Sequence, residues 1–398
     1  MVTTATKIYC ARALRDFGDG FVALLLPVYL GARGFDAFEI GTVATLALLG
    51  SALTTLAIGF IGARHAQRTL LIAAAALMTA TGIAFALSSV TAFVFLVAFL
   101  GTINPSAGSA SIFVPLEHAL IAETTPDTDR TKTFARYSLI GALAAALGAF
   151  AAATPDAMIA LGLSTLEALQ VMFVIYAALG VAGGAVYAAI PRGGHTTERG
   201  PAKPLGPSRA IVLKLAALFA IDSFAGGFVV QSLMALWLFD KFGLSLTAAA
   251  TFFLITGLLG AASLPIAGWL GARIGLVNTM VWTHIPANLA LIAAAFAPTL
   301  ESALALLAFR SLLSQMDVPA RSSYVMAVVT PEERTAAASF TAVPRSLASA
   351  ASPAIAGALF AAGYTALPLI LCGVLKTIYD LTLLMTFRNV KPPEEIRL

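Results

Sequence analysis

The chain has 398 residues, of which 59% are hydrophobic and 11% charged, and its mean hydropathy is +0.90. Soluble domains average about 25% charged residues, so this composition excludes a water-soluble globular protein. The net charge of +4 is small, and its location along the chain explains it without a nucleic-acid partner.

Long stretches without charge divide the chain into segments able to cross a bilayer, each about 20 residues long. Residues 69–116, 242–272 and 346–375 contain no Asp, Glu, Lys or Arg. The first span carries charged residues, so we interpret it as a retained helix and not as a cleaved signal peptide. In chain order we predict twelve helical spans, near residues 9–32, 40–62, 69–88, 92–122, 136–154, 168–190, 211–239, 246–270, 277–297, 302–328, 337–361 and 365–387.

The basic residues fall almost entirely on one side of these spans. With both termini placed inside, we count eighteen of the 24 Lys and Arg at or near the cytoplasmic face, and only Arg33 and Lys241 outside. The positive-inside rule therefore predicts cytoplasmic termini. Residues 191–209 are polar, basic and broken by Pro and Gly, which indicates a cytoplasmic linker between an N-terminal six-helix bundle (1–190) and a C-terminal one (210–398).

The two halves repeat one another. The segment Gly59-Phe60-Ile61-Gly62-Ala63-Arg64 returns as Gly268-Trp269-Leu270-Gly271-Ala272-Arg273, at an offset of 209. Farther on, Val114-Pro115 matches Val318-Pro319 at an offset of 204, so the first half carries five extra residues. A duplicated hydrophobic chain is typical of membrane transporters.

The extra residues belong to the fourth span. A helix over all of its 31 or so residues would measure about 46 Å at 1.5 Å per residue, well beyond the ~30 Å bilayer core. The segment Asn104-Pro105-Ser106-Ala107-Gly108 interrupts it with a proline and a glycine. We predict a break or a sharp kink near 104–109, which either exposes backbone groups to a ligand or only lengthens the outer loop.

Several charged residues lie inside predicted spans, where each costs roughly 2.5–3.5 kcal/mol on insertion scales and so needs a partner, water or a function. Helical spacing places the charged residues of the first span on a single face of that helix. It likewise places those of the tenth span on a single face of the tenth helix. The residues concerned are Arg12, Arg15, Asp16 and Asp19 in the first span, Glu117 and His118 in the fourth, Asp222 in the seventh, Arg310, Asp317 and Arg321 in the tenth, and Lys376 and Asp380 in the twelfth.

Some of these charges have a structural explanation. Asp16 is four residues from Arg12, and Asp317 is four residues from Arg321, so each can form a local ion pair. The same spacing predicts a structural pair between Lys376 and Asp380 in the twelfth span. We interpret His284 as a hydrogen-bonded core histidine, and His118 as either structural or a proton relay. Asp19 and Asp222 are harder to explain locally, and they lie at similar depths in equivalent helices.

The two halves, the basic middle loop and the repeated Gly-x-x-Gly-x-Arg turn resemble the major facilitator superfamily. The resemblance implies that helices 1, 4, 7 and 10 line a central cavity, and these spans carry most of the charges. The resemblance also implies gating roles for the residues of the repeated turn and their neighbours. We add Arg345 to these candidates because it lies in the cytoplasmic half of the eleventh span. These gating candidates are Gly59, Gly62, Arg64, Arg68, Arg273 and Arg345. Ala63 stands where the family carries an acid, and the Gly-Pro antiport signature is absent from 137–153.

The sequence thus predicts an all-α membrane protein with twelve transmembrane helices in two pseudo-symmetric six-helix bundles. We expect a secondary active transporter that works by alternating access, most simply proton-coupled efflux of a small molecule across the inner (plasma) membrane by a monomer. No ATP-binding motif, cofactor, metal site, enzymatic activity or nucleic-acid partner is expected. Candidate proton or substrate sites are Asp19, Asp222, Glu117, Asp16 and Asp317, and candidate substrate-binding residues are Arg310, Arg321, Gln231, Asn104 and Tyr324. Alternatives are a carrier, such as an importer, of an organic anion held by Arg310 and Arg321, and a non-transporting protein such as a lipid scramblase or scaffold.

Overall fold

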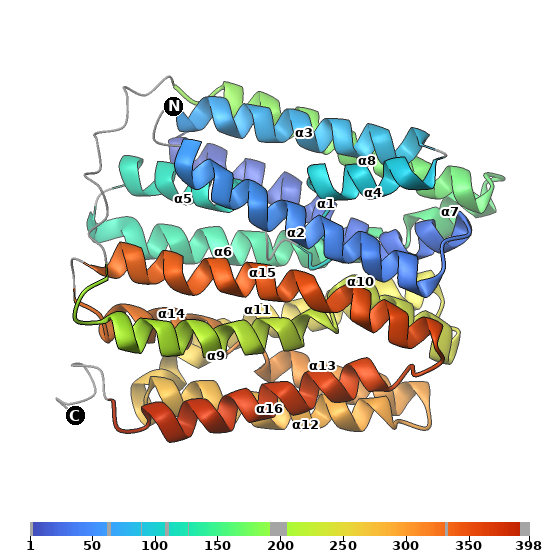
Figure 1. Cartoon of the computed structure of the whole chain (residues 1–398). Helices are drawn as coiled ribbons and strands as arrows, with labels where there is room; N and C mark the ends of the chain where they lie inside the picture. The colour runs from blue at the N-terminus through green and yellow to red at the C-terminus, as the bar shows by residue number, and fades with distance from the viewer. Residues whose placement is uncertain are drawn as a thin grey trace. The chain divides into compact units, whose positions relative to one another are not determined.

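A computed structural model describes residues 3–61, 65–88, 90–107, 111–125, 127–191, 205–330 and 333–390, and these residues form helices and turns without β-strands (Figure 1). The chain folds into two compact units. Unit 1 comprises Met1–Glu198 and Val230–Leu254, and unit 2 comprises Arg199–Val229 and Ile255–Leu398. The expected division into bundles at 1–190 and 210–398 stays a prediction, and 192–204 of the expected linker lie outside the described residues.

Unit 1 is built around α1, which packs against α6, α8 and α10. A second layer forms where α3 lies beside α8 and α2 beside α4 (Figure 1). Its helices are α1 (Thr4–Ala32), α2 (Ala37–Ile61), α3 (Gln67–Leu87), α4 (Thr91–Leu100), α5 (Phe113–Thr124), α6 (Asp127–Ala151), α7 (Thr154–Ala160), α8 (Thr165–Ala188), α10 (Gln231–Phe242) and the start of α11 (Leu246–Ile274).

Unit 2 is organised by two tight helix pairs, α9 with α15 and α12 with α16 (Figure 1). Its helices are α9 (Arg209–Gly227), the rest of α11, α12 (Leu276–Ala295), α13 (Leu300–Leu313), α14 (Asp317–Ala327), α15 (Arg334–Ala361) and α16 (Leu367–Phe387). Glu333, just before α15, accepts hydrogen bonds from the backbone N–H groups of Gly206 and Ser208 and from the Thr330 hydroxyl. Hydrogen bonds from Ser208, and then from Gly206, hold the pKa of Glu333 below its ordinary value. The carboxylate therefore ties the start of α9 to the start of α15.

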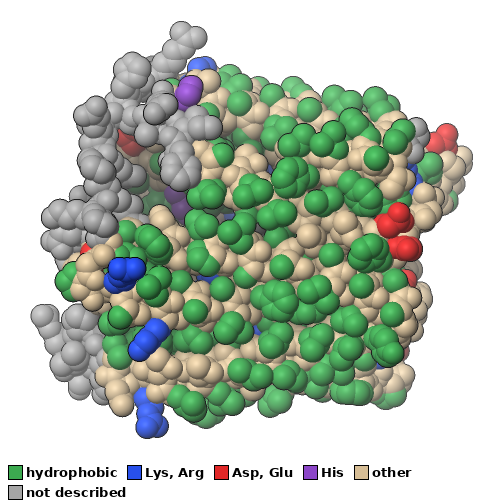
Figure 2. Space-filling view, viewed as in Figure 1, with side chains coloured by type: hydrophobic (Ala, Val, Ile, Leu, Met, Phe, Trp, Pro, Cys, Tyr) green, Lys and Arg blue, Asp and Glu red, His purple; other side chains and the backbone are tan. Residues whose placement is uncertain are grey.

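Eight segments are long and apolar enough to span a membrane within the described residues, and hydrophobic side chains are spread over the face of the molecule that Figure 2 shows. They correspond to eight of the predicted spans. The other four predicted spans correspond to α1, α4 with α5, α13 with α14, and α15, and for these the twelve-span count stays a prediction.

The break predicted in the fourth span is confirmed, because α4 ends at Leu100 and α5 begins at Phe113. Two further interruptions were not predicted. The seventh span changes helix at 228–230, between α9 and α10, and the tenth at 314–316, between α13 and α14. Three of the four helices that the family resemblance assigns to the cavity are thus broken in the described part of the chain.

Glycines allow the close helix contacts in unit 1. A Cβ atom at Gly20 of α1 would overlap the backbone of Ala145 in α6, and one at Gly148 of α6 would overlap the backbone of Phe17 in α1. These reciprocal contacts set the spacing between α1 and α6, so they also set the position of the charged residues on α1. Small residues that let helix backbones approach are a general device of membrane proteins.

We predict that Gly148→Ala lowers the free energy of unfolding of the purified protein by about 1–3 kcal/mol, because the added methyl group meets backbone that cannot move aside. Thermal unfolding in detergent measures the change. Gly183→Ala in α8 is the matched control, since a Cβ there meets no atom within 4 Å. Equal melting temperatures for the two variants would contradict the packing argument.

Candidate functional site

A cluster of charged side chains lies in the interior of unit 1. Arg15, Asp16 and Asp19 of α1 and Glu117 of α5 are each at most 3% exposed. They lie among apolar side chains of α1, α6 and α8, so each charge needs a partner within the unit.

Glu117 is the most fully bonded member of this cluster. Its Oε2 lies 2.9 Å from Arg15 Nη1 and accepts a hydrogen bond from the Tyr137 hydroxyl at 2.5 Å. Its Oε1 accepts a hydrogen bond from the Tyr187 hydroxyl at 2.6 Å. One carboxylate thus joins α1, α5, α6 and α8.

The predicted local pair between Arg12 and Asp16 is confirmed, with 2.5 Å between Arg12 Nε and Asp16 Oδ2. Arg15 Nε lies 3.3 Å from the other oxygen of Asp16. Arg12 also donates a hydrogen bond to the Tyr137 hydroxyl at 3.0 Å. Arg12 is therefore bonded to Asp16 and to the Tyr137 hydroxyl, and Arg15 is bonded to Asp16 and to Glu117.

Asp19 differs from its neighbours. Its carboxylate accepts a hydrogen bond from the Tyr176 hydroxyl at 3.4 Å, and no Lys or Arg nitrogen of the described residues lies within 4.0 Å of it. Two arginines (Arg12 and Arg15) therefore face three carboxylates (Asp16, Asp19 and Glu117). With all five ionised, the cluster carries one excess negative charge.

Unit 2 contains a second cluster, centred on Asp222 of α9. Lys376 Nζ lies 2.5 Å from Asp222 Oδ1, and Arg321 Nη1 lies 3.1 Å from Asp222 Oδ2. The same Arg321 nitrogen lies 3.0 Å from Asp317 Oδ2, which confirms the predicted pair within α14. Two cations thus balance two carboxylates here.

The predicted pair between Lys376 and Asp380 is wrong. The two residues are one turn apart on α16, but the lysine bonds to Asp222 of α9, whereas Asp380 faces α12. There its carboxylate lies 3.1 Å from His284 Nδ1 and accepts a hydrogen bond from Asn288 Nδ2 at 2.9 Å. Longer-range partners therefore replace the local one, and the interpretation of His284 as a hydrogen-bonded core residue is confirmed.

The other predicted binding residues lie apart from these clusters or support packing. Arg310 of α13 is half-buried and has no ion pair within the part of the chain that the structure describes. The Tyr324 hydroxyl donates to the Val390 carbonyl from within an apolar core. Asn104 Oδ1 accepts a hydrogen bond from the Ser106 N–H in the broken span, and Gln231 begins α10.

The predicted gating residues are only partly described. Gly59 lies in the last turns of α2, while Gly62 and Arg64 lie outside the described residues. Arg68 donates a hydrogen bond to the Ala188 carbonyl, and Arg345 donates one to the Ser223 hydroxyl within unit 2. The gating role of these residues stays a prediction.

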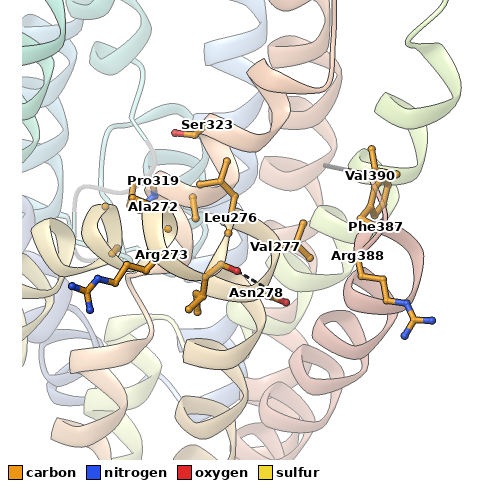
Figure 3. Close-up of a pocket in the computed structure, with 16 residues that line it drawn as sticks. Ala272, Arg273, Leu276, Val277, Asn278, Pro319, Ser323, Phe387, Arg388 and Val390 are labelled. Atoms are coloured by element: carbon orange, nitrogen blue, oxygen red, sulfur yellow. Dashed lines mark hydrogen bonds between the residues drawn. The ribbon is translucent and has the colours of Figure 1, made fainter. Parts of the chain in front are cut away.

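Arg273 lies beside a cavity of about 540 Å³ at the turn between α11 and α12. Figure 3 shows Arg273 and Arg388 on opposite sides of this cavity, with both guanidinium groups directed away from it. Arg273 instead stacks over the Trp269 ring at 4.3 Å. Neither arginine is directed into the cavity, and we do not take it as the functional site.

Sequence reasoning missed the three tyrosines that bind the carboxylates of unit 1. Tyr137, Tyr176 and Tyr187 are at most 2% exposed, and each hydroxyl contacts Glu117 or Asp19. The available signal was a polar ring in an otherwise apolar span, since buried tyrosine hydroxyls need a partner.

Within the described residues, no group of three or more His, Cys, Asp or Glu side chains is placed to hold a metal ion.

A bundle of apolar helices with charged clusters in its interior defines a class, the multi-pass membrane transporters. Residues 8–316 match the profile of the Major Facilitator Superfamily, and the chain belongs to that superfamily. The family and the all-α membrane fold expected from the sequence are thereby confirmed.

Comparisons with individual proteins agree with this assignment. The uncharacterized membrane protein YJR124C of Saccharomyces cerevisiae is 23% identical over 419 residues, which cover 96% of this chain and 94% of that protein. A bacterial homolog of the human lysosomal transporter Spinster, inward-facing and occupied, has a TM-score of 0.76 and 16% identity, with 96% of each chain covered. A mutant of the nucleoside transporter NupG has a TM-score of 0.76 and 12% identity, with 97% of this chain and 100% of that chain covered. At these identities the solved structures show the shared fold alone.

We predict that Lys376→Met destabilises the protein by roughly 3–5 kcal/mol, because it leaves a buried carboxylate without its balancing charge. The double variant Asp222→Asn/Lys376→Met should recover much of that loss, since the remaining Arg321 and Asp317 balance each other. Unfolding of each variant in detergent completes a double-mutant cycle. Strictly additive losses would show that the two side chains do not interact.

Proposed function

We propose that this protein is a proton-coupled secondary transporter and that Asp19 is the residue that takes up and releases the proton. The observation that carries the proposal is the charge imbalance of the cluster in unit 1. Its two arginines are already engaged by Asp16 and Glu117, whereas the hydrogen bond that Asp19 accepts within the described residues comes from a neutral tyrosine hydroxyl.

The physical reason is the cost of an unbalanced charge in a medium that cannot solvate it. One proton on Asp19 makes the cluster neutral, and loss of that proton restores the excess negative charge. Protonated Asp19 therefore favours an apolar environment, and ionised Asp19 favours a polar one. A pH gradient can drive the conformational change that moves Asp19 between these environments.

Asp222 is a weaker candidate for this role, although it occupies the equivalent helix of the second half. Two cations, Lys376 and Arg321, bond to its two oxygens and stabilise the ionised form. We therefore assign Asp222 to holding α9, α14 and α16 together. Glu117 is similarly engaged by Arg15 and two tyrosine hydroxyls.

The remaining features of the proposal come from the sequence. We propose outward movement of a small molecule by a monomer in the inner (plasma) membrane, with both termini in the cytoplasm. A lipid scramblase or a scaffold has no need of a carboxyl group that titrates, so the test of Asp19 also separates these alternatives from a transporter.

The test starts with a ligand-stabilisation screen of the purified protein across pH values, which supplies a substrate for flux measurements in proteoliposomes. We predict that Asp19→Asn abolishes the acceleration of flux by a pH gradient but retains substrate exchange without a gradient. The asparagine mimics the protonated carboxyl and cannot release a proton. Asp222→Asn is the comparison, and it should lower stability without removing the response to the gradient. Undiminished gradient-driven flux in Asp19→Asn would reject the proposal.

Arg310 supports a second candidate function, transport of an organic anion. Its half-buried guanidinium has no ion pair within the described residues, so it retains its capacity to bind a carboxylate or phosphate in a bidentate fashion. The human organic anion transporter MFSD10 shares the fold, with a TM-score of 0.63 and 16% identity. An anionic substrate is compatible with proton coupling through Asp19.

We predict that Arg310→Gln weakens binding of an anionic ligand from the screen at least tenfold, and that Arg310→Lys weakens it less. Titration of thermal stabilisation against ligand concentration measures both affinities. Arg388→Gln, which changes an exposed arginine at the end of α16, is the matched control. An unchanged affinity in Arg310→Gln would exclude this arginine from the binding site.

A further inference from the structure

We propose that Tyr176 is a positioning residue that transmits the protonation state of Asp19 to the interruption of the fourth span. The inference rests on the proposed role of Asp19 and adds the hydrogen bonds by which its protonation state acts on the interruption of the fourth span. It concerns unit 1 alone.

The geometry places one hydroxyl group between two acceptors. The Tyr176 hydroxyl lies 3.4 Å from Asp19 Oδ1 and 3.1 Å from the Thr102 carbonyl oxygen, and it lies 3.1 Å from Thr102 Oγ1. A phenol carries a single donor hydrogen. It can therefore bond well to the Asp19 carboxylate or to the Thr102 carbonyl, but not to both at once.

The tyrosine ring is held in place, so that the hydroxyl hydrogen is the part free to reorient. Tyr176 is 0% exposed. A Cβ at Gly18 of α1 would come within 2.9 Å of the ring, and Phe21 packs edge-on at a centroid distance of 6.5 Å. The missing side chain at Gly18 thus makes the room into which this ring fits.

Two hydrogen-bond arrangements follow. When Asp19 is protonated, it is neutral and can donate to the tyrosine oxygen, and Tyr176 then donates to the Thr102 carbonyl. When Asp19 is ionised, it competes for the tyrosine hydrogen, because bonds to a charged acceptor are roughly twice as strong as neutral ones. The Thr102 carbonyl then loses its donor. The proton that is bound or released belongs to Asp19 throughout, and Tyr176 stays neutral.

Thr102 is where such a change has an effect, because it lies in the break between α4 and α5. Its N–H is held by Thr81 Oγ1 at 3.2 Å, a bond that does not involve Asp19, and its carbonyl is held by Tyr176. Three residues later, the Pro105 carbonyl accepts a hydrogen bond from the Ser232 N–H at the start of α10. One of the two hydrogen bonds named for the Thr102 backbone therefore responds to Asp19, and the segment itself contacts the start of α10 in the interrupted seventh span.

Other charged groups around Asp19 do not offer the same route. Asp16, Arg15 and Arg12 act on Asp19 from its own helix. Glu117 of α5 is engaged by Arg15, and the hydroxyls of Tyr137 from α6 and Tyr187 from α8 bond to Glu117. Only Tyr176 bonds both to Asp19 and to a broken span within the described residues.

Hydrogen–deuterium exchange of the full-length protein in lipid nanodiscs tests the inference. Peptides covering 101–107 are compared from about pH 5 to about pH 9, the range in which buried carboxyls titrate, after correction for the intrinsic effect of pH. In the unaltered protein, exchange in this segment should rise about five- to tenfold on deprotonation, the equilibrium shift that one hydrogen bond produces. Tyr176→Phe should exchange fast at every pH, and Asp19→Asn slowly at every pH.

Tyr29→Phe is the matched control. Tyr29 is also fully buried, and its hydroxyl donates to a backbone carbonyl, that of Phe85, but it does not contact Asp19. This variant should keep the pH response. A pH response in Tyr176→Phe equal to that of the unaltered protein would overturn the inference.

The comparison with Asp19→Asn remains decisive if Tyr176→Phe does not fold, because a pH response retained in that segment of Asp19→Asn would also overturn the inference. The proposed function is tested separately by flux. If gradient-driven flux depends on Asp19 but hydrogen–deuterium exchange of residues 101–107 does not depend on Tyr176, Asp19 remains the proposed proton site. The proposed role of Tyr176 is then rejected.

Discussion

Charge balance inside an apolar helix bundle is the constraint on which this structure depends. Lipid tails offer no solvation, so each buried charge must be neutralised by side chains of its own unit. The cluster around Asp222 in unit 2 meets the requirement with cations, since Lys376 and Arg321 face Asp222 and Asp317. The buried cluster of unit 1 has one cation too few for its three carboxylates, Asp16, Asp19 and Glu117. The difference between the two clusters, more than either cluster alone, is what assigns a chemical role to Asp19.

Tyrosine hydroxyls are the second group that stabilises the buried carboxyls of unit 1. A hydroxyl can donate to a carboxylate and can equally accept from a carboxylic acid, so it accommodates both protonation states without bringing a charge of its own. A lysine or an arginine in the place of Tyr176 would instead stabilise the ionised form of Asp19. Neutral donors therefore keep a carboxyl titratable, whereas the cations around Asp222 keep it ionised.

Local patterns in the sequence predicted the helical spans, the break in the fourth span and the pairs one helical turn apart, such as Arg12 with Asp16. These features depend on spacing along one helix. The partners of Lys376 and Asp380 could not be predicted in this way, because α9 and α12 offer better-placed partners from more than 90 residues away. The tyrosines were missed for the same reason. A buried hydroxyl takes its role from what faces it, and only the packing of α1 against α8 shows that Asp19 faces Tyr176.

The composition of α1 also bears on how the protein is made. Arg12 and Arg15 accompany Asp16 and Asp19 on this helix, so residues 9–32 carry no net charge when they leave the ribosome. Its pairing within one turn is available before any other helix exists. Asp222 has no such neighbour on α9, and its cations follow about 100 and 150 residues later. We infer that charges on α1 can be neutralised within the helix as soon as it forms, whereas the charge of Asp222 gains its partners only after α14 and α16 have been synthesised.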